Sequence, residues 1–218
     1  MKKMFPLFLF FLLALSGCKS FLESSDSYAF KVVGSSTAQQ AYVYLCGLLT
    51  DFIPDQMPEL EVLDAVGKQI NSKLVVLIPT KRCANLGNRL CWPQDNKQEI
   101  LQTYQTICNS VQNQTIAGYI GFSNGGFFLN QLSQLVELNK PIISIGSAGP
   151  VYFSAIKNEI YLLIGKQDTW HYEHAIEFYK QSKKSQLIVH LCEYAQGHQL
   201  PEDLLRKVLA SCMSQHSP

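Results

Sequence analysis

The stretch Gly121-Phe122-Ser123-Asn124-Gly125-Gly126 decides the fold of this chain. It follows residues 116–120, a short apolar segment typical of a buried strand, and it precedes residues 127–132, which are typical of a helix. A serine at a sharp strand-to-helix turn has strained backbone angles, and the flanking glycines leave room where any Cβ atom would collide. The helix N-terminus behind the turn also favours developing negative charge. The pattern therefore predicts that the turn presents Ser123 as a nucleophile above a sheet.

Strand-like and helix-like segments alternate along the rest of the chain. The expected strands are residues 28–33, 41–45, 73–78, 116–120, 141–145, 160–164 and 187–191. The expected helices are residues 64–70, 99–111, 127–138, 171–180 and one that starts at Pro201, while residues 80–96 read as an irregular loop. This alternation, with short connections and no internal repeat, predicts a single α/β domain with a mostly parallel central sheet and helices on both faces.

The N-terminus has the features of a targeting segment. Lys2 and Lys3 precede an apolar run, residues 5–15, that is too short to span a bilayer. The next residues, Leu15-Ser16-Gly17-Cys18, resemble a bacterial lipobox. The resemblance implies a signal peptide at 1–17, a lipidated Cys18, a serine-rich tether at 18–27 and a domain at 28–218. An ordinary secretory signal with a chance cysteine is the alternative.

The resemblance to a lipobox also implies a location. Cys18 would be held by its acyl chains in the bacterial cell envelope, which needs no basic protein face. Lys19 follows in place of aspartate, which by analogy with Gram-negative sorting favours the outer membrane, facing the periplasm or the exterior. Removal of Lys2 and Lys3 leaves 16 basic against 17 acidic residues. A nearly neutral chain gives no reason to expect a nucleic-acid partner.

Six cysteines remain after Cys18, and an even number in an exported protein suggests disulfides. Six cysteines allow 15 pairings, which the sequence leaves open. Cys83 and Cys91 bracket a glycine-containing loop and are the best candidates for a local pair. No C-x-x-C is present, so we do not expect zinc. We also expect no other metal and no cofactor.

Three residues suited to nucleophilic catalysis follow three predicted strands. Ser123, Asp168 and His198 come in this order, and the ends of parallel strands meet at one edge of a sheet. Serine is a weak nucleophile that needs a base, and the base needs an acid to orient it. The three residues therefore form a candidate triad.

With this triad, residues 28–212 resemble the α/β-hydrolase family, in particular the carboxylesterase/phospholipase, dienelactone-hydrolase and polyester-depolymerase-like groups. The resemblance rests on the serine turn, on Gly165-Lys166-Gln167-Asp168 and on Gly197-His198-Gln199-Leu200-Pro201. It implies an acyl-enzyme on Ser123, a small-molecule ester substrate and an oxyanion held by the backbone N–H groups of Asn124 and Leu48. Cys46-Gly47 replaces the His-Gly common in relatives, so the second donor stays open.

Several other residues compete for these roles. Glu159, Glu173, Glu177 and Glu193 are weaker candidates for the acid. The weaker candidates for the base are His171, His174, His190 and His216. His171 and His174 have the spacing of a metal pair, but no carboxylate or cysteine is expected to complete their ligand set. Cys46 or Cys192 could be a reactive thiol, although a packed or disulfide-bonded cysteine is the simpler interpretation.

The short connection at residues 146–159 leaves no room for a cap domain. We therefore expect an open site with little apolar wall, a preference for short or flexible acyl esters and no interfacial activation. The alternative is that the loop of residues 80–96, with Trp92, folds over the site as a substitute wall. The main hypothesis is a lipid-anchored serine hydrolase that cleaves carboxylic esters. A non-catalytic binding protein and a hydrolase of amides or thioesters are the alternatives, and the natural substrate and the oligomeric state stay open.

Overall fold

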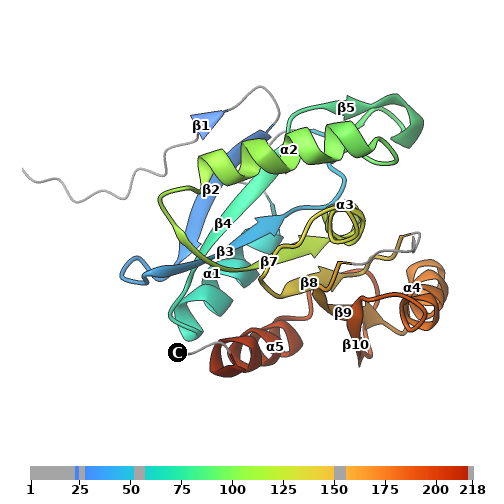
Figure 1. Cartoon of the computed structure of the whole chain (residues 1–218). Coiled ribbons are helices and arrows are strands. Elements are labelled where there is room, and N and C mark those ends of the chain that lie inside the picture. The colour runs from blue at the N-terminus through green and yellow to red at the C-terminus, as the bar shows by residue number, and fades with distance from the viewer. Residues whose placement is uncertain (1–22, 25–27, 52–56, 150–155, 216–218) are drawn as a thin grey trace, which may run out of the picture.

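A computed structural model describes residues 23–24, 28–51, 57–149 and 156–215 as one α/β domain (Figure 1). Eight strands form the central sheet in the order β1-β2-β4-β3-β7-β8-β9-β10. Their bounds are β1 Glu23–Ser24, β2 Tyr28–Gly34, β3 Gln40–Leu45, β4 Lys73–Pro79, β7 Thr115–Phe122, β8 Ile142–Ile145, β9 Glu159–Gly165 and β10 Ile188–Tyr194. The last six strands of this order pair in parallel, whereas β2 pairs antiparallel with β4 and β1 pairs antiparallel with β2. The predicted fold class is confirmed.

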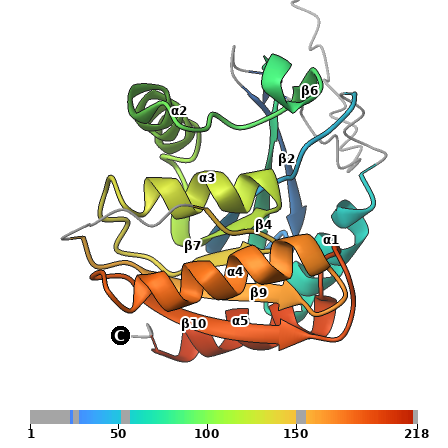
Figure 2. The same cartoon turned by 90° about the vertical axis from the view of Figure 1, so that its right-hand side faces the viewer.

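Five helices cover the two faces of the sheet (Figures 1 and 2). Their bounds are α1 Glu59–Gln69, α2 Lys97–Ser110, α3 Asn124–Leu132, α4 Thr169–Ser182 and α5 Glu202–Gln215. Buried residues of α2, α3 and α4 share one apolar cluster with the sheet, and those of α1 and α5 share the other. Strand β3 lies between the two clusters and is buried on both faces, which explains why its sequence is a continuous apolar run.

The helix after the serine turn is shorter than predicted, because it ends at Leu132 and not near residue 138. A distant side chain accounts for the difference. Asn158 is buried and donates to the carbonyl oxygens of Ser133 and Val136 at 2.7 and 2.9 Å, while its own oxygen accepts from Leu138 N at 3.0 Å. These bonds stabilise a turn in place of another helical turn.

The segment predicted as an irregular loop contains a small two-stranded sheet of its own. Strands β5 (Arg82–Cys83) and β6 (Arg89–Leu90) pair antiparallel around the 3₁₀ turn η2 (Ala84–Leu86), and a disulfide joins Cys83 to Cys91. Leu90 also exchanges two backbone hydrogen bonds with Leu49, at 2.8 and 3.2 Å. The loop is therefore anchored to the segment that follows β3.

Most of the N-terminal predictions concern residues outside the described ranges. The signal peptide at 1–17, Cys18 and most of the tether all lie there. Within the tether, Glu23 and Ser24 form β1 and pair with Phe30 and Ala29 of β2, so this part of the tether belongs to the sheet. No helix in the part of the chain that the structure describes is long and apolar enough to cross a membrane.

Candidate active site

Ser123 lies at the tip of the turn between β7 and α3, with φ 52° and ψ −115°. A positive φ is costly for a residue with a side chain and persists only where the surroundings enforce it. A Cβ atom on Gly121 would lie 2.5 Å from the carbonyl oxygen of Gly125, and one on Gly125 would strike the carbonyl oxygen of Leu45. The steric argument made from the sequence is therefore confirmed at both glycines.

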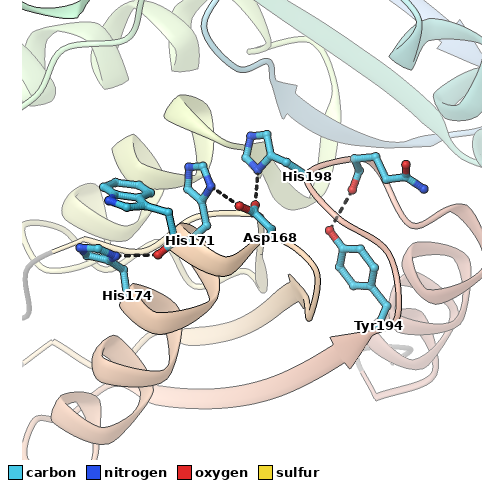
Figure 3. Close-up of polar contacts among 7 residues, drawn as sticks. Asp168, His171, His174, Tyr194 and His198 are labelled. Atoms are coloured by element: carbon cyan, nitrogen blue, oxygen red, sulfur yellow. Dashed lines mark hydrogen bonds and ion pairs between the residues drawn. The ribbon is translucent and has the colours of Figure 1, made fainter.

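Asp168 and His198 meet across two neighbouring loops of the sheet edge (Figure 3). His198 Nδ1 and Asp168 Oδ2 are 2.5 Å apart. The loops are tied by a backbone bond from Gln167 N to Gln196 O at 3.2 Å. The Tyr194 hydroxyl donates to Gln199 O at 2.9 Å and so fixes the turn that carries the histidine.

The ring of His198 lies against the residues that flank the serine turn. It contacts the ring of Phe122, which precedes Ser123, at a centroid distance of 4.8 Å. A Cβ atom on Gly146 would lie 3.0 Å from both Cε1 and Nδ1 of the imidazole. Gly146 follows Ile145, whose carbonyl oxygen accepts from Ser123 N at 2.8 Å. The structure thus brings all three predicted triad residues to one place.

One contact of a working triad is not formed in this state. Among the described residues, neither His198 nor His171 makes a hydrogen bond to Ser123 Oγ. Bonds between nucleophile and base often tighten only when substrate binds. The acid–base contact is therefore in place, and the base–nucleophile contact requires a rotation of side chains.

A second histidine shares the carboxylate, which the sequence analysis did not anticipate. His171 Nδ1 and Asp168 Oδ1 are 2.7 Å apart, and the rings of His171 and His198 stack at 4.2 Å with 15° between their planes. Burial opposes ionisation of Asp168, but the hydrogen bonds from both histidines outweigh it and lower the pKa of this carboxyl. A detectable sequence signal existed, because Asp168 and His171 are three residues apart at a helix start.

The expectation that no carboxylate lies near His171 is consequently wrong. Ligand atoms of Asp168, His171 and His198 all lie within 4.8 Å of one another, as a metal site would require. A tetrahedral metal with bonds of about 2.0–2.2 Å would, however, separate nitrogen and oxygen ligands by about 3.3–3.6 Å. The observed distances of 2.5 and 2.7 Å are those of hydrogen bonds. His174 does not join the group, because its Nδ1 lies 2.6 Å from Trp170 O.

The two segments proposed for the oxyanion hole are both held by Trp92. Its backbone N–H donates to Asn124 Oδ1 at 2.7 Å, and its indole N–H donates to Cys46 O at 2.8 Å. Trp92 is 1% exposed, so these bonds are shielded from water. Leu48 lines the same cavity as Ser123 and Asn124. This placement is compatible with the two proposed N–H donors.

Two of the competing acids are engaged elsewhere, whereas Glu177 lines the same cavity as Ser123. Glu193 contacts the hydroxyl of Tyr172, and Glu159 accepts from His190 at 2.9 Å. Burial raises the pKa of the Cys46 thiol, as it does for Cys192, which disfavours a reactive thiolate at either position. His216 lies outside the described ranges.

A cavity of about 580 Å³ opens beside Ser123. Its apolar lining comes from α3, α4, the segments after β3 and β8, and the disulfide loop: Leu48, Leu86, Phe127, Ala148, Trp170 and Phe178. The expectation of little apolar wall is therefore wrong, although β8 ends at Ile145 and β9 begins at Glu159, which leaves the connection as short as predicted. The members of this wall lie far apart in the sequence, and Leu86 of the disulfide loop and Trp170 and Phe178 of α4 are among them.

Comparison with known proteins places this architecture. No protein-family model and no curated protein matches the chain. Among solved structures, a carboxylesterase from Mesorhizobium loti is similar with a TM-score of 0.65, at 12% identity over 89% of this chain and 98% of its own. The Bacillus cereus carboxylesterase gives 0.61, at 12% identity over 86% and 93%. SOBER1 from Arabidopsis thaliana gives 0.63, at 16% identity over 83% and 100%. The chain therefore has the fold of the α/β hydrolases.

Proposed function

We propose that this protein is a serine hydrolase that cleaves carboxylic esters through an acyl-enzyme on Ser123. The observation that carries the proposal is the convergence of Asp168 and His198, already bonded at 2.5 Å, beside a serine with φ 52°. Fold likeness alone would not support an activity, because one fold hosts many functions. The carboxylesterases among the similar structures agree with the proposal.

The proposed chemistry follows from the geometry. An ionised Asp168 accepts from Nδ1–H of His198, which leaves Nε2 as the proton acceptor. After a rotation that brings Nε2 to Ser123 Oγ, the imidazole takes the serine proton as Oγ attacks the acyl carbon. The imidazolium then protonates the leaving alcohol, and water releases the acid by the same route. Backbone N–H groups of Asn124 and Leu48 are the proposed oxyanion donors.

The cavity indicates the class of substrate. An open, mostly apolar space of about 580 Å³ beside the nucleophile is suited to an aliphatic or aryl acyl group larger than acetyl. Each methylene that it buries is worth about 0.8 kcal/mol, or about a fourfold gain in kcat/KM. The rate constant should therefore increase with chain length until the cavity is filled.

A fluorophosphonate probe provides the first test. The wild-type chain and Ser36→Ala, a control at an exposed serine, should be labelled, and Ser123→Ala should not be labelled while its melting temperature is retained. Labelling of Ser123→Ala would refute the assignment of the nucleophile. A series of p-nitrophenyl esters from C2 to C12, with matched amides and thioesters, then defines the scissile bond and the acyl preference.

One observation supports a second candidate, a binding protein on a hydrolase scaffold. Among the residues that the structure describes, neither His198 nor His171 is hydrogen-bonded to Ser123 Oγ. A binding protein would bind apolar acids or esters in the cavity but would show neither probe labelling nor turnover. Calorimetric titration with a hydrolysis-resistant ester analogue, combined with the labelling experiment, separates the two functions.

The proposed location is the cell envelope, with the chain anchored through a lipidated Cys18. The proposal rests on the sequence Leu15-Ser16-Gly17-Cys18 after a short apolar run. Mass spectrometry of protein extracted from membranes should find acylated Cys18 at the mature N-terminus. A soluble mature protein that keeps an unmodified Cys18 would refute this location.

A further inference from the structure

His171 contacts the carboxylate of the candidate triad and the candidate base at the same time (Figure 3). Its Nδ1 is 2.7 Å from Asp168 Oδ1, while His198 holds Oδ2. Because an ionised carboxylate only accepts hydrogen bonds, both imidazoles donate from Nδ1. The bridging carboxylate is nearly buried, with 10% of its side chain exposed. Two bonds from two different elements therefore fix its rotation.

The stacked geometry determines what His171 can do. The rings lie 4.2 Å apart at 15°, so a positive charge on both at once is unfavourable. Burial, together with the charge of His198, lowers the pKa of His171 despite the opposing effect of Asp168. The titratable groups that face His171 are Asp168, His198 and His174. A neutral His171 places no second positive charge beside His198 when His198 takes the serine proton.

We propose that His171 is a positioning residue for the Ser123–His198–Asp168 triad: it keeps Oδ2 of Asp168 directed at His198 and stacks on His198 as a neutral ring. The inference rests on the proposed function. Asp168 is the N-cap residue of α4 but makes no capping bond with its side chain. Instead, Oδ1 of Asp168 accepts a hydrogen bond from His171, which lies in the first turn of the same helix.

Two substitutions separate the hydrogen bond from the stack. His171→Asn keeps an N–H donor in reach of Oδ1 but removes the ring, and His171→Phe keeps a ring but removes the donor. Loss of a bond to a charged group predicts a decrease in kcat of about 10- to 100-fold in His171→Phe and His171→Ala, with little change in KM. His171→Asn should restore most of kcat.

The pH profile provides a readout that a merely structural role would not change. Without the His171 donor, the Asp168 carboxylate interacts more strongly with a protonated His198. The acid limb of kcat/KM should therefore move to higher pH in His171→Phe and less in His171→Asn. His190→Ala is the matched control, because His190 also contacts a carboxylate, Glu159, and stacks on Tyr161 at 4.8 Å.

Each outcome decides between the possible roles. Unchanged kcat and pH profile in His171→Phe, with or without a lower melting temperature, would overturn the inference. Retained probe labelling in His198→Ala together with its loss in His171→Ala would also overturn it, because His171 would then be the base. If the wild type is not labelled at all, the proposed function fails. NMR of Ser123→Ala still tests the inference, since the low-field Nδ1 proton of His198 should shift in His171→Phe and not in His190→Ala.

Discussion

Gly146→Ala tests the position of His198 without altering any side chain of the candidate triad. Gly146 follows β8 with φ 55°, and an added Cβ would lie 3.0 Å from two atoms of the imidazole. Ordinary contacts of a Cβ atom begin near 3.4 Å, so the ring must move by about 0.4 Å. The loop that carries His198 is exposed and can accommodate the shift.

The structure sets the magnitude of both expected effects. A side chain at positive φ costs about 1–2 kcal/mol, which for a chain of this size lowers the melting temperature by about 2–8 °C. A displacement of about 1 Å in an active site costs about 100-fold in rate, so 0.4 Å should lower kcat by about five- to tenfold. Steady-state kinetics with a p-nitrophenyl ester and a thermal melt measure the two effects separately.

Gly87→Ala is the control for the backbone strain. Gly87 has φ 69°, but the nearest atom to its added Cβ is Arg89 Nε at 3.9 Å, in open space. This variant should lose a similar amount of stability and keep its kcat. If Gly146→Ala also keeps its kcat, or if both variants lose activity equally, the reasoning about the position of His198 is refuted.

Three further predictions concern stability and the loop beside the site. The double variant Cys83→Ser/Cys91→Ser should lose about 2–3 kcal/mol of unfolding free energy, measured by urea denaturation, because an eight-residue separation closes a short loop. Trp92→Phe removes the indole bond to Cys46 O and should cost about 1–3 kcal/mol and lower kcat, whereas an unchanged kcat would exclude a role in holding the oxyanion segment. The pKa of Asp168 is lowered from 3.8 in the folded chain, so the ionised carboxylate stabilises the fold above pH 3.8. This stabilisation is lost as the pH falls through the folded pKa. Asp168→Asn lacks the carboxylate and should therefore show a flatter loss of stability from pH 5 to 2.

The features predicted from sequence are those that short segments specify. The turn at Ser123 was predictable because two glycines and a serine define it locally, and strand ends brought Asp168 and His198 into consideration. The antiparallel β2 was not predictable, since its apolar run resembles that of a parallel strand. The end of α3 depends on Asn158, which is 26 residues beyond Leu132 in the chain. The cavity wall depends on Leu86, whose position is set by a disulfide loop rather than by its own sequence pattern.

The loop that carries Trp92 connects the proposed chemistry with the proposed location. Trp92 bonds both candidate oxyanion segments, and its neighbour Cys91 is held by the disulfide to Cys83. Reduction would release one anchor of the loop and leave the bridge between Leu49 and Leu90 and the two hydrogen bonds of Trp92 in place. Disulfides persist in oxidising compartments, which agrees with an exported chain without depending on its N-terminus. If a reductant lowers kcat in wild type but not in Cys83→Ser/Cys91→Ser, then the geometry of the site depends on the compartment that the N-terminal sequence independently indicates.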